Sequence, residues 1–324
     1  MAVTLNDAAK QMTDPLRKGV IMNLLRYSDL LALIPFESVS ALDSIAVRWK
    51  ELPTSGFRKI NAGYTEGAGT TEQVVESIKL LGGDVDIDRV FNKVSNYIED
   101  PGITQTKMKT KSVAFEFNYY AIKGSPTLDE DGFYGLEYRV DQLPARQKFA
   151  LGSAGTPYDC TADAAHEHAF LDGLHKLNAL VGGADAYLCN FNMRLGVGRV
   201  LRRLGLLETT TDQFDREVYT FGGAPIIDAG LQRDQSTEII TDTEDPGDGG
   251  EDTTSVYAAK FGLDDGMIGI QLEELEAYWV GGEEHELEAK PVRRLRIDWG
   301  VGLAGFGSYY VARMCNLKPA SSWT

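Results

Sequence analysis

The sequence has few of the residues that mark disulfide-rich, metal-binding or membrane proteins. Its 324 residues include three cysteines, which are far apart and form none of the short pairs that bind zinc or exchange disulfides: Cys160, Cys189 and Cys315. No apolar run approaches the roughly 18 residues that a membrane-spanning helix needs, and the first residues lack the basic and apolar pattern of a signal peptide. We therefore expect buried free thiols in a soluble cytoplasmic protein with no membrane partner.

Positive charge is also scarce. Lys and Arg number 32 against 48 Asp and Glu, which gives a formal net charge of −16 at pH 7. Nucleic-acid readers gain much of their affinity from basic side chains that neutralise phosphates, so this balance argues against such a function. Self-association remains compatible with it where contacts are extensive or locally complementary. The length, with an ordinary hydrophobic fraction of 43%, predicts two packed subdomains or one domain with long excursions.

Motifs for catalysis and cofactor binding are missing or lack the context they need. Gly300–Gly305 matches G-x-G-x-x-G, but a dinucleotide site also needs a helix, a second parallel strand and an acidic residue about twenty residues later. No acidic residue follows Asp298 in this chain. His166 and His168 are two apart on an expected helix and point in different directions, and His285 lies among glutamates. No nucleophile elbow, Walker loop or zincin motif is present. We therefore predict no catalytic residue, no cofactor and no metal site.

Three segments have helical periodicity. Residues 14–34 open with an Asp-Pro helix start and end at Pro35, which predicts one or two short helices. Residues 163–182 begin with a capping aspartate and end in a glycine pair, and residues 193–204 carry apolar residues on one face and arginines on the other. The predicted strand ADAYLCNF lies between these last two helices, which indicates a mixed α/β subdomain.

A long hairpin is predicted between residues 45 and 91. Apolar and charged residues alternate from Ile45 to Leu52, and alternating runs return from Gln73 to Leu81 and from Val85 to Phe91. The polar stretch between them is rich in glycine. A two-stranded ribbon has too little apolar surface to be stable alone, so we expect it to lie on a neighbouring subunit. The alternative is an ordinary hairpin folded onto its own domain.

Residues 103–124 fit two structures. The string DPG before them is typical of a helix start and GSP after them of a helix stop, and several apolar side chains recur on one helical face. The string VAFEFNY within them also alternates like a strand and is rich in aromatic residues. The residues alone leave this choice open.

An acidic segment occupies residues 234–254. Its string TDTEDPGDGGEDTT has no basic and no apolar residue, which predicts a solvated loop. So many carboxylates could bind calcium, but their spacing does not fit an EF-hand loop. The strings SVYAAKFG, MIGIQLE and RRLRIDW that follow are predicted to be strands.

The order of an N-terminal arm, a long hairpin, a long helix, an α/β subdomain and a returning strand resembles the major capsid proteins of tailed bacteriophages, which have the Hong Kong 97 fold. In that family the long helix typically ends in glycine and is followed by a Phe-x-Gly-Leu turn, and IKGSPTLDEDGFYGL at residues 122–136 has that form. The strings TFGGAPIIDAG, SVYAAKFG and RLRIDWGVGL also look similar to strands of such proteins. The resemblance spans nearly the whole chain and favours the helix over residues 103–124.

The resemblance implies an α+β fold of the Hong Kong 97 type with residues 103–124 as its spine helix. It assigns the remaining segments as an N-terminal arm at 1–40, an extended loop over a neighbouring subunit at 41–91, a peripheral domain at 92–150, an axial domain at 151–278 that contains the acidic loop 234–254, and a return to the peripheral domain at 279–324.

The implied function is structural rather than enzymatic. Many copies would form the hexamers and pentamers of an icosahedral virion head, assembled in the host cytoplasm, that encloses double-stranded DNA without reading its sequence. The implied partners are a portal protein, a separate scaffolding protein, because no extra helical segment precedes the arm, and possible decoration proteins. Candidates for contact between subunits lie on the hairpin: Arg48, Lys50, Arg58, Lys59, Tyr64 and Glu66.

Two other functions remain open from the sequence. An encapsulin-type compartment has the same fold and would enclose a cargo enzyme, and a cytosolic enzyme that binds a nucleotide at the Gly300 region would be a small oligomer. Some capsid proteins also form a Lys–Asn isopeptide bond between subunits. Lys59 and Asn316 match that pair by residue type only, so this chemistry cannot be assigned to them.

Overall fold

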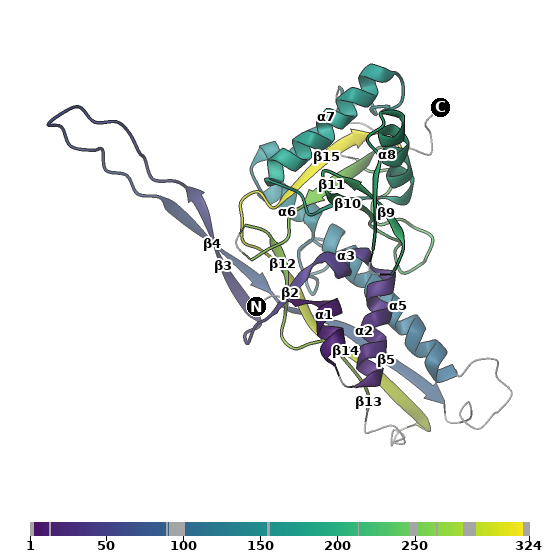
Figure 1. Ribbon diagram of the computed structural model, residues 1–324. Coiled ribbons are helices and arrows are strands. Elements are labelled where there is room, and N and C mark those ends of the chain that lie inside the picture. Colours follow the sequence, from purple (N-terminus) through teal and green to yellow (C-terminus); the bar gives the residue numbers. More distant parts are fainter. Residues whose placement is uncertain are drawn as a thin grey trace.

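The computed structural model describes residues 3–12, 14–88, 90, 101–153, 156–212, 214–245, 252–263, 265–280 and 290–319. Two sheets with their helices form an elongated body, and a two-stranded hairpin projects from one side of it (Figure 1). Within the described part of the chain, no helix combines the length and apolar character that a membrane crossing requires.

The first sheet lies in the lower half of the body in Figure 1 and has six strands. Its longest strand, β14, pairs with β12 and β13 along one edge and with ten residues of β5 along the other. The strand bounds are β1 (Val3–Thr4), β2 (Pro35–Ser38), β5 (Lys79–Asp88), β12 (Met267–Gln271), β13 (Glu276–Trp279) and β14 (Val292–Gly305).

The long helix α5 (Pro101–Lys123) packs against this sheet, so the helical interpretation of residues 103–124 is confirmed. Val113, Phe117 and Ala121 are buried at helical spacing. The Phe117 ring stacks on Trp299 of β14 with ring centroids 5.5 Å apart. This contact joins the buried face of the helix to the apolar face of the sheet. The helix ends at Lys123, directly before the Gly-Ser-Pro stop that the sequence predicts at residues 124–126.

Short helices cover the same region near the N-terminus. They are α1 (Leu5–Gln11), α2 (Pro15–Tyr27) and α3 (Asp29–Leu33). The side chain of Asp14 accepts a hydrogen bond from the Leu16 amide at the start of α2, and β2 begins at Pro35 after α3. The prediction of one or two short helices over residues 14–34 is therefore confirmed, with two.

The second sheet has seven strands and lies in the upper half of the body (Figure 1). Its strands in order are β6 (Lys148–Ala150), β15 (Val311–Leu317), β11 (Thr254–Ala259), β7 (Ala186–Cys189), β10 (Ala224–Asp228), β9 (Glu217–Phe221) and β8 (Glu208–Thr211). Helices α7 (Ala164–Val181) and α8 (Phe191–Arg203) pack on it, and α6 (Leu136–Gln142) lies beside β15. The predicted strand between two helices, β7, is present.

Helix α7 begins and ends as its sequence predicts. The Asp163 side chain accepts a hydrogen bond from the His166 amide at its start. Gly182 adopts the left-handed conformation, with φ of +67°, and donates its N–H to the last carbonyls of the helix. Helix α8 follows β7 at once, and Asn190 caps it by accepting a hydrogen bond from the Met193 amide.

The hairpin is shorter than the sequence predicts. It consists of β3 (Asp43–Glu51) and β4 (Thr70–Ser77) alone, because β5 leaves it and pairs with β14. After residue 279, β14 pairs with β12 in the six-stranded sheet, whereas β15 pairs with β11 and β6 in the seven-stranded sheet. The assignment of residues 151–278 and 279–324 to axial and peripheral domains stays a prediction.

Candidate functional site

The hairpin presents an apolar face that its own chain leaves largely uncovered. Ile45 pairs with Val75 across the two strands, and Val47 and Trp49 continue the same face of β3. These four side chains are between 55% and 72% exposed. An isolated two-stranded ribbon is marginally stable in water, so this face needs a partner surface. The hairpin is therefore the leading candidate for contact with another molecule.

The tip of the hairpin, residues 52–69, combines apolar and basic side chains. Phe57 and Ile60 are fully or almost fully exposed, and Tyr64 is 71% exposed. The Arg58 guanidinium lies 5.2 Å from the centre of the Tyr64 ring and donates a hydrogen bond to the Ala62 carbonyl. The tip is thus a cationic, aromatic protrusion.

The structure places all six contact candidates on the hairpin, but in different settings. Arg48 is half-buried and donates to Glu72 on the paired strand at 3.0 Å, so its charge is balanced within its own hairpin. This pairing lowers the pKa of the Glu72 carboxyl. Lys50, Lys59 and Glu66 are exposed to solvent. The structure brings Arg58 and Tyr64 together.

A buried ion pair anchors the hairpin to the body. Glu76, at the base of β4, receives hydrogen bonds from both terminal nitrogens of Arg139 in α6, and both side chains are at most 5% exposed. Arg139 also donates to the carbonyls of Tyr134 and Leu303, at 3.0 and 2.8 Å. Burial alone would lower the pKa of this guanidinium, but Tyr310 and Glu76 raise it above its usual value.

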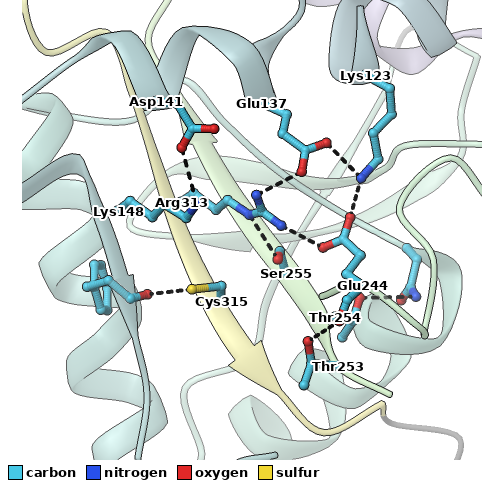
Figure 2. A network of polar contacts seen from close by, with 12 residues as sticks. Lys123, Glu137, Asp141, Lys148, Glu244, Thr253, Thr254, Ser255, Arg313 and Cys315 are labelled. Atoms are coloured by element: carbon cyan, nitrogen blue, oxygen red, sulfur yellow. Dashed lines mark hydrogen bonds and ion pairs between the residues drawn. The ribbon is translucent and has the colours of Figure 1, made fainter. Parts of the chain in front are cut away.

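A second polar cluster joins the two sheets, as Figure 2 shows. Arg313 of β15 donates to Glu244 at 3.0 Å and to Glu137 of α6 at 2.9 Å, and Lys123 at the end of α5 contacts the same two carboxylates. Two positive and two negative charges thus balance at the junction. Arg313 and Lys123 hold the pKa of Glu137 below its usual value, although burial opposes them.

The cluster also corrects the prediction for the acidic segment. We expected residues 241–254 to form a solvated loop, yet Glu244, Thr253 and Thr254 are buried. Two ion pairs, with Lys123 and Arg313, compensate the buried charge of Glu244. Thr254 is the first residue of β11. Residues 246–251 lie outside the described part of the chain.

The motifs set aside in the sequence have structural roles. Gly300–Gly305 lies inside β14 rather than between a strand and a helix. A Cβ at Gly302 would lie 2.8 Å from the Ser77 carbonyl oxygen, and one at Gly305 would collide with the Tyr310 ring. These glycines therefore let neighbouring groups pack close to the strand. The three cysteines are free and buried, and burial raises the pKa of the Cys160 and Cys189 thiols.

The remaining candidates for chemistry fare as follows. His166 bonds to Asp163, its helix cap, at 2.7 Å. Among the described residues, no group of three or more His, Cys, Asp and Glu side chains is arranged to hold a metal ion, and His285 lies outside them. Asn316 is fully buried and donates to the carbonyls of residues 151, 153 and 156, so its amide is not placed to react with a lysine of another subunit.

Sequence reasoning missed the apolar contact residues and the anchor. The candidates chosen were mainly charged, whereas Trp49, Phe57 and Ile60 make the larger exposed surface. A usable signal was present, because these large apolar residues occur in or beside a stretch rich in Gly and Thr that has no core of its own. Glu76 and Arg139 are 63 residues apart, and no local pattern links them.

No protein-family model and no curated protein sequence matches the chain. Solved structures do match it in three dimensions. The capsid of a native GTA particle has a TM-score of 0.61 and 14% sequence identity, over 91% of this chain and 90% of that one. The holo-SrpI encapsulin complex from Synechococcus elongatus PCC 7942 has a TM-score of 0.60 and 14% identity, over 91% and 89% of the two chains.

A chain from Mycobacterium phage Bobi has a TM-score of 0.57 and 9% identity, over 89% of each chain. The likeness therefore extends over about nine tenths of the chain rather than one common motif. The chain has the Hong Kong 97-type capsid fold. The α+β fold class predicted from the sequence is confirmed, and the structures similar to this chain include a GTA capsid and an encapsulin complex.

Proposed function

We propose that this chain is the major capsid protein of a tailed bacteriophage. The projecting hairpin with its uncovered apolar face carries the proposal, because a monomer would gain nothing from exposing Ile45, Val47 and Trp49 to water. Its fold is that of a phage capsid chain and of the capsid of a GTA particle. Copies of the chain would cover each other's hairpins as they form hexamers and pentamers.

The segments take roles within this proposal. The hairpin at residues 43–77, within the segment 41–91, is the extended loop that lies on a neighbouring subunit, and α5 is the spine helix of the peripheral domain. The seven-stranded sheet with α7 and α8 is the axial domain, to which β15 contributes. Residues 1–40 form the N-terminal arm.

The proposed setting is the virion head. Contacts that are weak singly become a durable shell when each subunit touches several neighbours, which suits a surface of separated apolar and charged patches. The partners would be other copies of the chain, a scaffolding protein, a portal protein and packaged double-stranded DNA. A net charge of −16 would let that DNA be held without sequence-specific binding.

An encapsulin-like compartment is the second candidate, because the encapsulin complex matches with nearly the same TM-score as the GTA capsid. The contents of the particles distinguish a phage head from a compartment. The chain is produced alone and together with the neighbouring reading frames of its genome, and the purified particles are analysed for DNA and protein. Double-stranded DNA inside shells that need a scaffold supports a phage head. Shells that form unaided around a protein cargo support the compartment, and a small oligomer under every condition refutes both.

A further inference from the structure

A small apolar cavity lies beside α3. It has a volume of about 270 Å³ and lies between α3 and the strands β8, β9 and β10. Leu33, Val218 and Ile227 form its apolar lining, together with Ala32 and Pro225. This is the kind of recess that accepts one large side chain in a protein interface.

The mouth of the cavity is acidic. Arg216 donates to Asp29 and to Asp212 at 2.6 Å each, so these two lining carboxylates share one positive charge. The exposed Glu208 of β8 lies two residues from Thr210 and on the same strand face, whereas Glu217 of β9 lies on the opposite face from the lining residue Val218. The rim therefore carries a net negative charge around an apolar floor.

The hairpin tip has the complementary composition. Phe57 is fully exposed, and the basic residues Arg58 and Lys59 follow it directly. The nearest acidic side chain in the tip is Glu66, seven residues after Lys59, so the tip as a whole carries one net positive charge and its two cations lie next to Phe57. An aromatic side chain flanked by two cations matches an apolar recess with an acidic rim in both shape and charge.

Another cavity of similar size fits the tip less well. It lies between α2, α5 and β13 and is also largely apolar, but Lys107 and Arg293 are among its lining residues. Cations there would repel Arg58 and Lys59. Charge therefore selects the cavity beside α3 over this one.

We infer that the cavity beside α3 receives Phe57 of a second copy of this chain, with Arg58 and Lys59 meeting the acidic rim. This inference rests on the proposed shell function and names the surface that the hairpin reaches. In Figure 1 the hairpin projects from the side of the body opposite to β9, a strand that contributes to the cavity, so the occupant comes from another copy. A protrusion on one side and its receptor on the other make a head-to-tail contact, which generates rings when its rotation closes.

Cysteine cross-linking tests the pairing directly. Ser55→Cys places a thiol two residues before Phe57, and Thr210→Cys places one at the edge of the cavity. The two variants are made separately and mixed before assembly, and a short bismaleimide reagent joins only thiols of different copies. The parent chain gives the background because its three cysteines are buried. Ile103→Cys, which lines the competing cavity and is 52% exposed, is the matched control.

We expect a covalent dimer from Ser55→Cys with Thr210→Cys and only background from Ser55→Cys with Ile103→Cys. Assemblies that form without the first dimer, or with equal amounts of both, overturn the inference and leave the shell function standing. Failure of the parent chain to form any assembly beyond a small oligomer overturns the proposed function and the inference with it.

Charge exchange provides an independent measurement. Arg58→Glu with Lys59→Glu should abolish sedimenting assemblies, because the tip would then bring two carboxylates to a rim that is itself acidic. Adding Glu208→Lys to that double variant should restore assembly in part, whereas adding Glu217→Lys, on the opposite strand face, should not. Full assembly of the double variant, or no recovery with Glu208→Lys while the circular dichroism of that variant matches the parent, contradicts the pairing.

Discussion

The ion pair between Glu76 and Arg139 should make a large contribution to folding, and its removal gives a sharp test. In the variant Glu76→Gln the Arg139 charge stays buried, with the Leu303 and Tyr134 carbonyls, the Tyr310 hydroxyl and the new amide to solvate it but no carboxylate. Breaking a buried pair by removing one partner typically costs about 3–5 kcal/mol. We expect a loss of that size in the free energy of unfolding.

Glu72→Gln is the matched control on the same strand. It removes the same charge from a pair with Arg48 of similar length, but Glu72 is 45% exposed. Solvent screening limits such pairs to at most about 1 kcal/mol. Urea unfolding of the unassembled chain, followed by tryptophan fluorescence, measures both variants. Equal losses in the two variants, or a loss below about 1 kcal/mol for Glu76→Gln, would refute the anchoring role of the buried pair.

Four further outcomes are expected. Trp49→Ser should leave the unfolding midpoint unchanged, because the side chain is 72% exposed, and yet reduce assembly measured by light scattering. Glu244→Gln should cost about 3 kcal/mol in urea unfolding, the low end for a broken buried pair, because Arg313 and Lys123 would then share Glu137 alone. Gly305→Val should cost at least about 1–3 kcal/mol in the same assay, because its side chain would meet the Tyr310 ring. Burial and the nearby carboxylates of Asp242 and Asp228 raise the pKa of the Glu238 carboxyl from 4.5 to about 7. Between these two pH values the folded state keeps a proton that the unfolded chain has released, so the free energy of unfolding should fall as pH rises from 4.5 to about 7. Glu238→Gln should match the parent in thermal melting near pH 4 and exceed it near pH 8; equal melting at both pH values would contradict this ionisation.

The helices of the second sheet could be predicted because each combines an apolar stripe with local stop and start signals. The caps at Asp163 and Gly182 form hydrogen bonds with backbone groups three or four residues away, so the residue types at these two positions are enough to predict them. Helix α5 was harder, because its buried aromatic residues also alternate. Packing of Phe117 on Trp299, a contact 182 residues apart, decides in favour of the helix.

The sheet partners of β5 and β15 depend on contacts that no local pattern records. All seven residues of β15 are buried, so its sequence lacks the alternation that would indicate one covered face. The alternating β5 fits a hairpin partner as well as it fits β14, and register along ten residues of β14 decides between them. The buried charge cluster of Glu137, Glu244 and Arg313 likewise joins segments far apart in the chain.

The most direct test of the shell function is electron microscopy of the purified chain, produced alone and with the neighbouring reading frames of its genome, with light scattering on the same samples. Closed icosahedral particles, or capsomer rings that become closed particles when a scaffolding protein is present, are the predicted result. A uniform small oligomer under every condition would contradict the account.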